Sequence, residues 1–572
     1  AGQPRPFDLP FTEIFGEGDH NPAGLAVTGE HLVVLLSNRV AFLDRNSAEV
    51  LKSIDVPPLK GIAAASDGIL YAIDTQSVYR IDGKLDKIST RGLEKPAAIA
   101  VDNQGNIVVA DAGTDMQVKA FTPRGKLVYT CGRKGGRPTR GKFDPQAMRA
   151  MSSVAVDHEG QVWVVENWEY PRRVSVWSPK DGSLVRDYVG NTGYAAVGTV
   201  LHDTNPNLAY VGPNELSLNK SNRTWQVSRI LWVPDESAGE SLALNAQDMA
   251  PGNHFTATVN GGSREYHFSP PYRNYNGYII YMERENGSQP VAAITTVGRI
   301  CRSFSGKGDA PKPPDGEFAD LNVFDVVFWN DRNRDGKVQR TECEIMKTDE
   351  PPSKKQRGKS ALPMSSGWGE RMGTNFVFYM NGIHKVSPLG FSADGAPWYG
   401  PKSVEKMSFT DTGDFVPVVD EGLLLCLNTS GSRAQPSHVA GYDSMSGALR
   451  WEYPNPYPGV HGSHRATMPQ SGMIIGPLRI CGVAQVNEQV GRVFLIRGNL
   501  GQDYFMTTDG LFVGAMFQDG RLPAEKLPNK EEQLVGMPME GFSHGGEPFN
   551  GWFGKQSDGN IRMTTGFPRQ AG

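Results

Sequence analysis

Short runs of alternating apolar and polar residues, joined by polar turns, recur along the chain and predict β-hairpins. Residues 96–110 read PAAIAVDNQGNIVVA, residues 152–165 read SSVAVDHEGQVWVV, and residues 61–72 give a degenerate copy, GIAAASDGILYA. In each copy two β-rich runs flank a polar turn with glycine at a fixed place, which is typical of a β-hairpin. Recurrence at intervals of about 40 to 55 residues makes the hairpin a repeating unit of the length found in propeller blades.

A second kind of hairpin lies between these copies. Residues 38–54 read NRVAFLDRNSAEVLKSI, and residues 118–129 and 174–189 repeat this shape as VKAFTPRGKLVY and VSVWSPKDGSLVRDYV. We interpret these segments as outer hairpins that alternate with the inner ones. Together they predict about four blades of roughly 45 residues each in the first third of the chain.

Beyond residue 200 the spacing of the strand-like runs becomes irregular. Insertions rich in proline and glycine separate the runs, and residues 307–314 and 350–359 have the composition of solvated loops. The blade pattern returns late, for example in HVAGYDSMSGALRWEY at residues 438–453. We therefore predict three parts: regular blades in 1–200, irregular blades with long insertions in 201–410, and C-terminal blades that close the propeller in 411–572.

Length and composition agree with this pattern. A chain of 572 residues is too long for one ordinary core, so it forms either several domains or a repeat architecture that grows by adding units. Its 38% hydrophobic content, with 66 glycines and 40 prolines, describes a turn-rich β protein. The sequence predicts an all-β fold: a single large β-propeller with long inserted loops, seven or eight blades being favoured. The alternative is two smaller propellers.

The repeats resemble those of two propeller families. The early hairpins are similar to blades of the NHL and gluconolactonase type, and AGYDSMSGALRW at residues 440–451 resembles the AxDxxTGxxxW blade motif of quinoprotein propellers. Several blades carry the tryptophan motif in quinoproteins, whereas only Trp451 matches well here. The resemblance implies a propeller fold and gives little support for a quinone cofactor.

Charge and hydropathy narrow the choice of partners. A net charge of −4 gives no general affinity for nucleic acid, and the sequence has no run of 18 or more apolar residues that could span a membrane. The opening AGQPRPFDLP fits a mature product after signal cleavage, which predicts an extracytoplasmic location: periplasmic, cell-surface or secreted. The five cysteines are widely spaced and odd in number, so we favour free thiols, with one or two long-range disulfides as the alternative.

One loop has the residue spacing of a calcium site. The segment 331–342, DRNRDGKVQRTE, places side-chain oxygens at positions 1, 3, 5, 9 and 12, with glycine at position 6. Ca²⁺ prefers six to eight oxygen ligands in a flexible loop with a sharp turn. The segment resembles EF-hand or dockerin loops, but β-rich sequence replaces the entering helix, which indicates a structural clip. The expected ligands are Asp331, Asn333, Asp335, Lys337 through its carbonyl, Gln339 and Glu342.

Histidines near the C-terminus are candidates for catalysis. His461, His464 and Arg465 lie in PGVHGSHRATMPQSG, and His544 lies in the similar setting FSHGGEPFNGWFG. Imidazole can act as an acid, a base or a metal ligand near neutral pH, and Arg465 could neutralise a carboxylate. Loop histidines also often only cap backbone groups. If they are functional, these residues would serve a lyase or hold a transition metal.

Aromatic and basic residues gather in two segments that could bind sugars. Aromatic rings stack on sugar rings, and arginine binds carboxylates through two hydrogen bonds. The same residues could instead hold long loops against a β surface. The candidates are Trp168, Tyr266, His267, Tyr272, Arg273 and Tyr275.

These observations lead to three hypotheses for function. The first is an exported, calcium-binding propeller that acts on an acidic polysaccharide or cell-surface glycan, as a lyase or a glycoside hydrolase. The second is a non-catalytic propeller that serves as a binding or scaffold module in a cell-surface assembly. The third is a metal-dependent oxidoreductase that uses histidine ligands. The sequence has no nucleotide-binding glycine loop, no GxSxG elbow and no HExxH helix.

Overall fold

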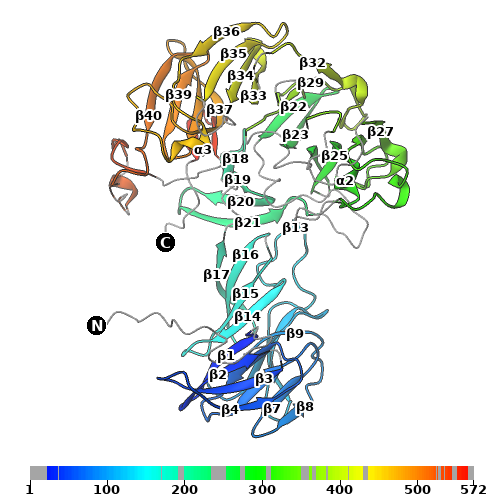
Figure 1. Cartoon of the computed structure of the whole chain (residues 1–572), viewed down its shortest axis with the longest axis vertical. Helices are drawn as coiled ribbons and strands as arrows, with labels where there is room; N and C mark the ends of the chain where they lie inside the picture. Colours follow the sequence, from blue (N-terminus) through cyan, green and yellow to red (C-terminus); the bar gives the residue numbers. More distant parts are fainter. Residues whose placement is uncertain are drawn as a thin grey trace. The chain divides into compact units, whose positions relative to one another are not determined.

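The structure is a computed structural model that describes most of the chain from residue 22 to residue 564. The segments outside this description are 1–21, 37, 169, 191–198, 234–252, 271–276, 286, 304–310, 349–359, 364–368, 382–383, 410, 412, 429–435, 524, 526–527, 529, 534, 544–550 and 565–572. The described chain is built almost entirely of antiparallel strands (Figure 1). It divides into two compact units: residues 1–138 with 143–190, and residues 139–142 with 191–572.

Unit 1 consists of four sheets of four strands, each with its strands in chain order. The first strands of successive sheets contact one another, as inner strands do in a propeller. The strands are β1 (Gly24–Val27), β2 (His31–Leu36), β3 (Arg39–Asp44), β4 (Val50–Asp55), β5 (Gly61–Ala64), β6 (Leu70–Ile73), β7 (Val78–Ile81), β8 (Leu85–Ile88), β9 (Pro96–Val101), β10 (Ile107–Asp111), β11 (Gln117–Phe121), β12 (Leu127–Cys131), β14 (Met151–Val156), β15 (Val162–Glu166), β16 (Arg172–Trp177) and β17 (Leu184–Gly190).

The repeated hairpin turns of unit 1 have a simple local cause. Asp102 follows β9, and its Oδ1 accepts hydrogen bonds from the backbone N–H groups of Gln104 (2.9 Å) and Asn106 (2.8 Å). Gly105 adopts a φ of 80°, a conformation that costs little only for glycine. Asp157 and Gly160 form the same turn between β14 and β15. The aspartate and glycine of the sequence repeat thus close the hairpins β9–β10 and β14–β15.

Unit 2 contains the remaining sheets, which are less regular in strand number. Its first sheets have the orders β13-β21-β20-β19-β18 and β22 to β27 in sequence. Their strands are β13 (Gly141–Lys142), β18 (Val200–Leu201), β19 (Leu208–Val211), β20 (Asn214–Asn219), β21 (Thr224–Ile230), β22 (Asn253–Val259), β23 (Gly262–Ser269), β24 (Tyr278–Arg284), β25 (Gly287–Thr296), β26 (Val326–Asn330) and β27 (Cys343–Met346).

Two four-stranded sheets and three smaller ones complete unit 2, and β28, β33, β37 and β41 contact one another in succession. The strands are β28 (Phe378–Met380), β29 (His384–Val386), β30 (Gly390–Phe391), β31 (Pro397–Trp398), β32 (Val404–Lys406), β33 (Asp414–Val418), β34 (Leu423–Asn428), β35 (His438–Asp443), β36 (Leu449–Tyr453), β37 (Pro477–Asn487), β38 (Gly491–Gly498), β39 (Asp503–Thr507), β40 (Phe512–Met516), β41 (Trp552–Lys555) and β42 (Ile561–Thr564). The described helices are short: α2 (Val297–Ile300), α3 (Val460–Ser463), and the 3₁₀ turns η2 (Gly316–Phe318), η3 (Arg340–Glu342), η4 (Pro401–Ser403), η5 (Val419–Glu421) and η6 (Glu531–Gln533).

At strands β22 and β23, the sheet from β22 to β27 has two chemically different faces. Side chains alternate between the faces along each strand. Phe255, Tyr266, Phe268 and Tyr278 point to one face and are buried in the largest hydrophobic core of the unit. The residues between them, His254, Glu265 and His267, therefore point to the other face. This alternation places a polar cluster directly behind a hydrophobic core.

The structure confirms the predicted all-β fold with propeller-type blades. The number of blades, and the choice between one large propeller and two smaller ones, stay predictions. All five cysteines are free thiols, as favoured from their number and spacing. None of the helices in the described part of the chain is both long and apolar enough to cross a membrane.

Candidate metal centre

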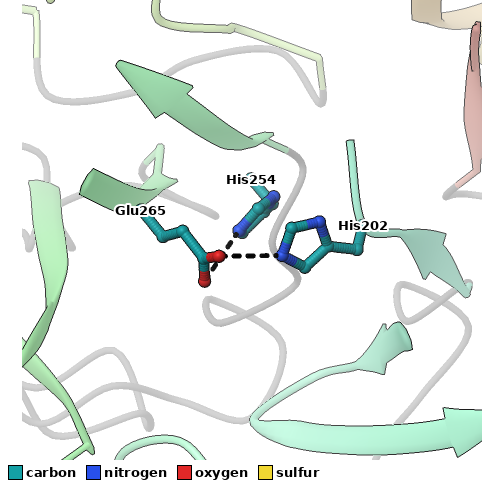
Figure 2. Close-up of side chains that lie close together, drawn as sticks. All are labelled: His202, His254 and Glu265. Carbon is teal, nitrogen blue, oxygen red and sulfur yellow. Dashed lines mark ion pairs between the residues drawn. The ribbon is translucent and has the colours of Figure 1, made fainter. Parts of the chain in front are cut away.

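Two histidines and a glutamate converge in unit 2. His202 follows the short strand β18, His254 lies on β22, and Glu265 lies on the neighbouring strand β23. Figure 2 shows both imidazole rings directed at the Glu265 carboxylate. One ligand atom from each residue lies within 4.8 Å of the other two. These three side chains, which we call the His-His-Glu cluster, have the donor types that bind divalent transition metals.

Strand pairing explains why two of these residues meet. His254 is paired with His267 across the antiparallel ladder of β22 and β23, and Glu265 precedes His267 by two residues. Paired residues and residues two apart share a face of the sheet, so all three side chains lie on one side. His202 joins them from β18, where its ring centroid is 4.0 Å from that of His254.

The ring nitrogens nearest to Glu265 are both Nε2 atoms. His202 Nε2 lies 3.3 Å from Glu265 Oε1, and His254 Nε2 lies 3.9 Å from Oε2. Ligand atoms bound tetrahedrally to zinc at about 2.0–2.1 Å are separated by roughly 3.3 Å. The observed spacing is therefore close to that of a zinc site. The Glu265 side chain is 40% exposed whereas both rings are buried, so the cluster is open on the carboxylate side.

A fourth residue, Asp203, faces the opposite edge of both rings. Its Oδ1 lies 3.1 Å from His202 Nδ1 and 3.0 Å from His254 Nδ1. The backbone N–H of Thr256 donates to Asp203 Oδ2 at 2.8 Å and fixes the carboxylate. Histidine ligands of metals usually donate their second ring nitrogen to a carboxylate or carbonyl, which orients the ring. Asp203 is placed to do this for both histidines at once.

Among the described residues, the ring nitrogens of His254 have no hydrogen-bond partner, and Nδ1 of His202 is occupied by backbone donors. Neither nitrogen of His254 makes a hydrogen bond within the described part of the chain, although the ring is fully buried. In His202, Nδ1 accepts from the backbone N–H groups of Thr204 (3.1 Å) and Asn205 (3.0 Å). Those two bonds put the proton of a neutral His202 ring on Nε2, directed at Glu265.

Further charged residues lie near the cluster, on β23 and β24 of the same sheet and on β20 and β21 of the neighbouring one. His267 Nε2 lies 3.3 Å from Glu283 Oε1, and Arg229 bridges Glu283 (2.7 Å) and Glu215 (2.6 Å). Counting Asp203 and Glu265, four carboxylates meet a single arginine among these residues. Such an excess of negative charge at partly buried positions favours a cation or a protonated histidine beside it.

The pKa shifts reflect this excess of negative charge. Burial by itself would lower the pKa of His202, but the carboxylates of Asp203 and Glu265 outweigh it and raise the pKa to about 9. The two histidines lower the pKa of Glu265, against its partial burial. Burial lowers the pKa of His267 and keeps that ring neutral. The position between the carboxylates of Asp203 and Glu265 thus favours positive charge.

The predicted calcium loop joins β26 to η3 and β27, so strands flank it as expected. Asp331, Asp335 and Glu342 bring carboxylate oxygens within 4.8 Å of one another. Asp331 Oδ1 accepts the backbone N–H of Gly336 (3.1 Å), whose φ of 70° makes the sharp turn. Asp331 Oδ2, however, forms an ion pair with Arg284 at 2.9 Å.

The other expected ligands of this loop are engaged with each other. Asn333 and Gln339 both donate side-chain N–H groups to Asp335 Oδ2, at 3.1 and 2.7 Å. Glu342 accepts the backbone N–H of Asn333 at 3.0 Å and the Nε1–H of Trp329 at 3.2 Å. The loop has the EF-hand-like turn and three convergent carboxylates, and Arg284 supplies positive charge at position 1.

The histidines singled out from the sequence are not members of the His-His-Glu cluster. His461 is on α3, and His464 follows that helix, where its Nε2 is 3.1 Å from Asn499 Nδ2. Both rings and Arg465 are exposed. Arg465 lines an open pocket together with Tyr457, Thr467, Gln470 and Met473. His544 lies outside the described residues.

The predicted sugar-binding residues are also dispersed. Tyr266 is fully buried in the core and donates its hydroxyl hydrogen to the Gly395 carbonyl at 2.8 Å, so its ring has no free face. His267 is buried beside the His-His-Glu cluster. Trp168 belongs to unit 1 and packs against Tyr170. Tyr272, Arg273 and Tyr275 lie outside the described residues.

Sequence reasoning missed His202, Asp203, His254 and Glu265. They are far apart in the sequence and form no spacing motif, so only strand pairing brings them together. One signal was present: on β22 and β23, His254, Glu265 and His267 each stand next to an aromatic residue. Polar residues at alternating positions of a buried strand require partners.

The chain is only weakly similar to known proteins. No family model matches the chain, and no curated protein matches it. Among solved structures, hydrazine synthase of Kuenenia stuttgartiensis has a TM-score of 0.25 and 13% identity, covering 61% of this chain and 99% of its own. Virginiamycin B lyase from Staphylococcus aureus has a TM-score of 0.24 and 12% identity, covering 54% and 92%.

A third solved structure, the Cps50 (Swd1) β-propeller domain of Myceliophteria thermophila, has a TM-score of 0.24 and 9% identity, covering 36% of this chain and 71% of its own. Similarity at this level carries no functional argument. The propeller-type fold therefore rests on the blades of the chain itself, and the function has to be argued from its own side chains.

Proposed function

We propose that unit 2 is a metal-dependent enzyme whose divalent metal ion is held by His202, His254 and Glu265. The observation that carries this proposal is the two-sided arrangement of the imidazole rings: both Nε2 atoms face Glu265, and both Nδ1 atoms face one oxygen of Asp203. A histidine pair with one carboxylate leaves at least one coordination position for water or substrate, as in catalytic zinc sites.

The metal would supply Lewis-acid chemistry: it polarises a bound oxygen atom and lowers the pKa of a bound water. The protein residues position it. Asp203 orients the two rings, and the hydrophobic core behind β22 and β23 fixes the strands that carry His254 and Glu265. The exposed side of Glu265 gives a substrate access to the cluster.

Metal binding has one structural requirement at His202. A metal on Nε2 needs the ring proton on Nδ1, where Asp203 can accept it. The backbone N–H groups of Thr204 and Asn205 now occupy Nδ1, so both bonds have to lengthen when the metal binds. The loss of these two bonds lowers the affinity, and the pairing of Nδ1–H with Asp203 offsets it.

Metal titration of the purified protein tests the proposal. We expect stoichiometric Zn²⁺ binding, a loss of at least about 100-fold in affinity for His254→Ala, and no change for His384→Ala, a histidine on β29 outside the cluster. Elemental analysis would show which metal the protein carries from its source. Unchanged zinc affinity in the His254→Ala variant would refute the proposal, and copper or iron in place of zinc would favour the oxidoreductase hypothesis.

The acidic-polysaccharide hypothesis remains a second candidate because of the open pocket beside α3. Arg465, Tyr457 and Gln470 line this pocket and offer a carboxylate-binding group, an aromatic ring and an amide. A lyase acting on a uronic-acid polymer would produce an unsaturated sugar that absorbs in the ultraviolet. We expect Arg465→Ala to weaken binding of such a polymer, and an unchanged affinity would exclude this pocket.

We also propose that residues 331–342 bind Ca²⁺ as a structural clip. The convergent carboxylates and the Gly336 turn support this proposal, whereas the Arg284 ion pair opposes it. Chelation should lower the melting temperature, and Asp331→Ala should abolish the difference between chelated and calcium-loaded protein. An identical melting temperature with and without calcium would exclude the clip.

A further inference from the structure

A second site is marked by a pocket of about 340 Å³ in unit 2. It lies at strands β22, β33, β37 and β41, which are all the first strands of their sheets, and β33, β37 and β41 contact one another in succession. Its volume is at the lower end of the range for small-molecule sites. The residues that matter for its chemistry are Arg371, Thr374, Gln485, Arg492 and Lys555, with Phe255, Val416, Val418 and Val483 as the apolar part of the wall.

Arg371 is the unusual residue of this pocket. Its Nη2 donates to the Cys481 carbonyl at 2.8 Å, and its buried Nε has no hydrogen-bond partner in the described structure. Across the described residues, no aspartate or glutamate forms an ion pair with it. Burial lowers the pKa of Arg371 to about 10, and the nearby Arg479 acts in the same direction. Arg371 is half-buried, and a guanidinium held partly out of water without a carboxylate is costly unless a ligand supplies the negative charge.

The other charged residues of the pocket do not fill this role. Arg492 is already paired with Asp420 and Glu421. Lys555 is exposed at the end of β41 and lines the same pocket, so it adds a second positive charge that a ligand can reach. The pocket therefore has two cations available for a ligand, and the one acid that lines it is neutralised.

The apolar part of the pocket wall favours an organic anion over an inorganic one. An inorganic ion gains nothing from contact with Phe255 and the valines, whereas the carbon skeleton of an organic acid buries apolar surface there. The planar guanidinium of Arg371 can bind both oxygens of a carboxylate. Thr374 and Gln485 offer hydrogen bonds to hydroxyl groups.

We propose that this pocket binds a small organic carboxylate, with Arg371 as the carboxylate-binding residue and Lys555 as a secondary charge. The site shares no ligand residue with the His-His-Glu cluster: Phe255 points to the opposite face of β22 from His254. Binding at the pocket is therefore independent of the metal proposal.

Isothermal titration of the full chain, treated with chelator to remove metals, tests this inference with D-glucuronate as the probe and D-glucose as the neutral control. We expect saturable binding of glucuronate and none of glucose. Arg371→Met should weaken glucuronate binding by about 10- to 100-fold, the loss expected for hydrogen bonds to a charged group. Arg450→Met, an arginine paired with Asp443 outside the pocket, should bind as wild type does.

Two further variants keep the test decisive if Arg371→Met does not fold. Lys555→Met changes an exposed residue and should weaken binding by several-fold, and Arg371→Lys should bind more weakly than wild type. The inference is overturned if glucuronate does not bind, if glucose binds equally, or if Lys555→Met and whichever Arg371 variant folds both bind as wild type does.

Discussion

Single side chains decide the chemistry of the proposed metal centre, and Asp203 is the clearest case. It is not one of the three proposed ligands, yet one of its oxygens lies within 3.1 Å of both Nδ1 atoms. We expect Asp203→Asn to weaken Zn²⁺ binding by about 10- to 100-fold, because such outer carboxylates orient histidine ligands. A zinc competition assay would measure this.

The matched control is Asp411→Asn, which alters a similar His–Asp pair elsewhere in unit 2 and should leave the zinc affinity unchanged. Equal loss in both variants would contradict the positioning role.

The His438–Asp411 pair predicts a pH dependence of stability away from the metal centre. His438 Nε2 lies 2.7 Å from Asp411 Oδ2, and this contact raises the pKa of His438. Burial would raise the pKa of Asp411, but His438 and Tyr442 lower it overall. The histidine contributes stability that is complete below its unfolded pKa of about 6.5 and is lost as the pH rises through its higher folded value. The aspartate contributes above about 3.9 and loses its contribution on acidification below that.

We therefore expect His438→Gln to be less stable than wild type by about 1 kcal/mol or less between pH 5 and 6.5, a modest value because the pair is partly exposed. The deficit should shrink as the pH rises toward 9. Denaturant unfolding at several pH values measures it, with His158→Gln as the control on a 92% exposed ring. A deficit that is constant across this pH range would show that packing, not the ion pair, is responsible.

At the scale of elements, the two faces of β22 and β23 have separate roles. Phe268 is fully buried in the core, and its ring lies 5.1 Å from that of Phe378. We expect Phe268→Ala to lower the free energy of unfolding by about 3–5 kcal/mol. Thr258→Ala, at an exposed position of β22, should change it by less than about 0.5 kcal/mol. Denaturant titration of both variants gives the comparison, and similar values for the two would contradict the assignment of the faces.

The loop 331–342 gives a second prediction at this scale. Arg284 neutralises Asp331 at the position where calcium would bind, so Arg284→Gln should increase Ca²⁺ affinity by roughly tenfold, the effect of about 1.4 kcal/mol of charge repulsion. Arg334→Gln is the control, because Arg334 is on the same loop and shares Asp394 with Arg284 but is not the arginine paired with Asp331. Titration with a fluorescent calcium competitor would compare the variants. A decrease in affinity for Arg284→Gln would show that the arginine supports the loop rather than competes with the ion.

Turns could be predicted because their residues are close together in the sequence. Ligand clusters could not, because their residues are far apart in the sequence. The hairpins of unit 1 were predicted because Asp102 and Gly105 form the turn with their immediate neighbours. The strand-flanked loop at 331–342 was found for the same reason. In unit 2, long insertions hid the blade pattern, and the number of strands per sheet could not be predicted.

The metal centre could not be predicted because it depends on non-local pairing. His254 and His267 face each other only through the register of β22 with β23, and His202 reaches them from β18. The sequence instead emphasised His461 and His464, since glycine and proline around them resemble a functional loop. Those rings are exposed, in contrast to the buried rings of His202 and His254.

For the whole molecule, the position of the ligands predicts which parts of the chain respond to metal. His202, His254 and Glu265 all belong to unit 2, and unit 1 has hydrophobic cores of its own. A ligand stabilises the state that binds it, by about 2.7 kcal/mol when its concentration is 100 times the dissociation constant. We therefore expect Zn²⁺ to slow hydrogen exchange up to about 100-fold in β18, β22 and β23. The strands β9 to β12 of unit 1 should exchange at unchanged rates. Slower exchange confined to residues 331–342 would place the zinc ion in the acidic loop and would contradict the His-His-Glu assignment.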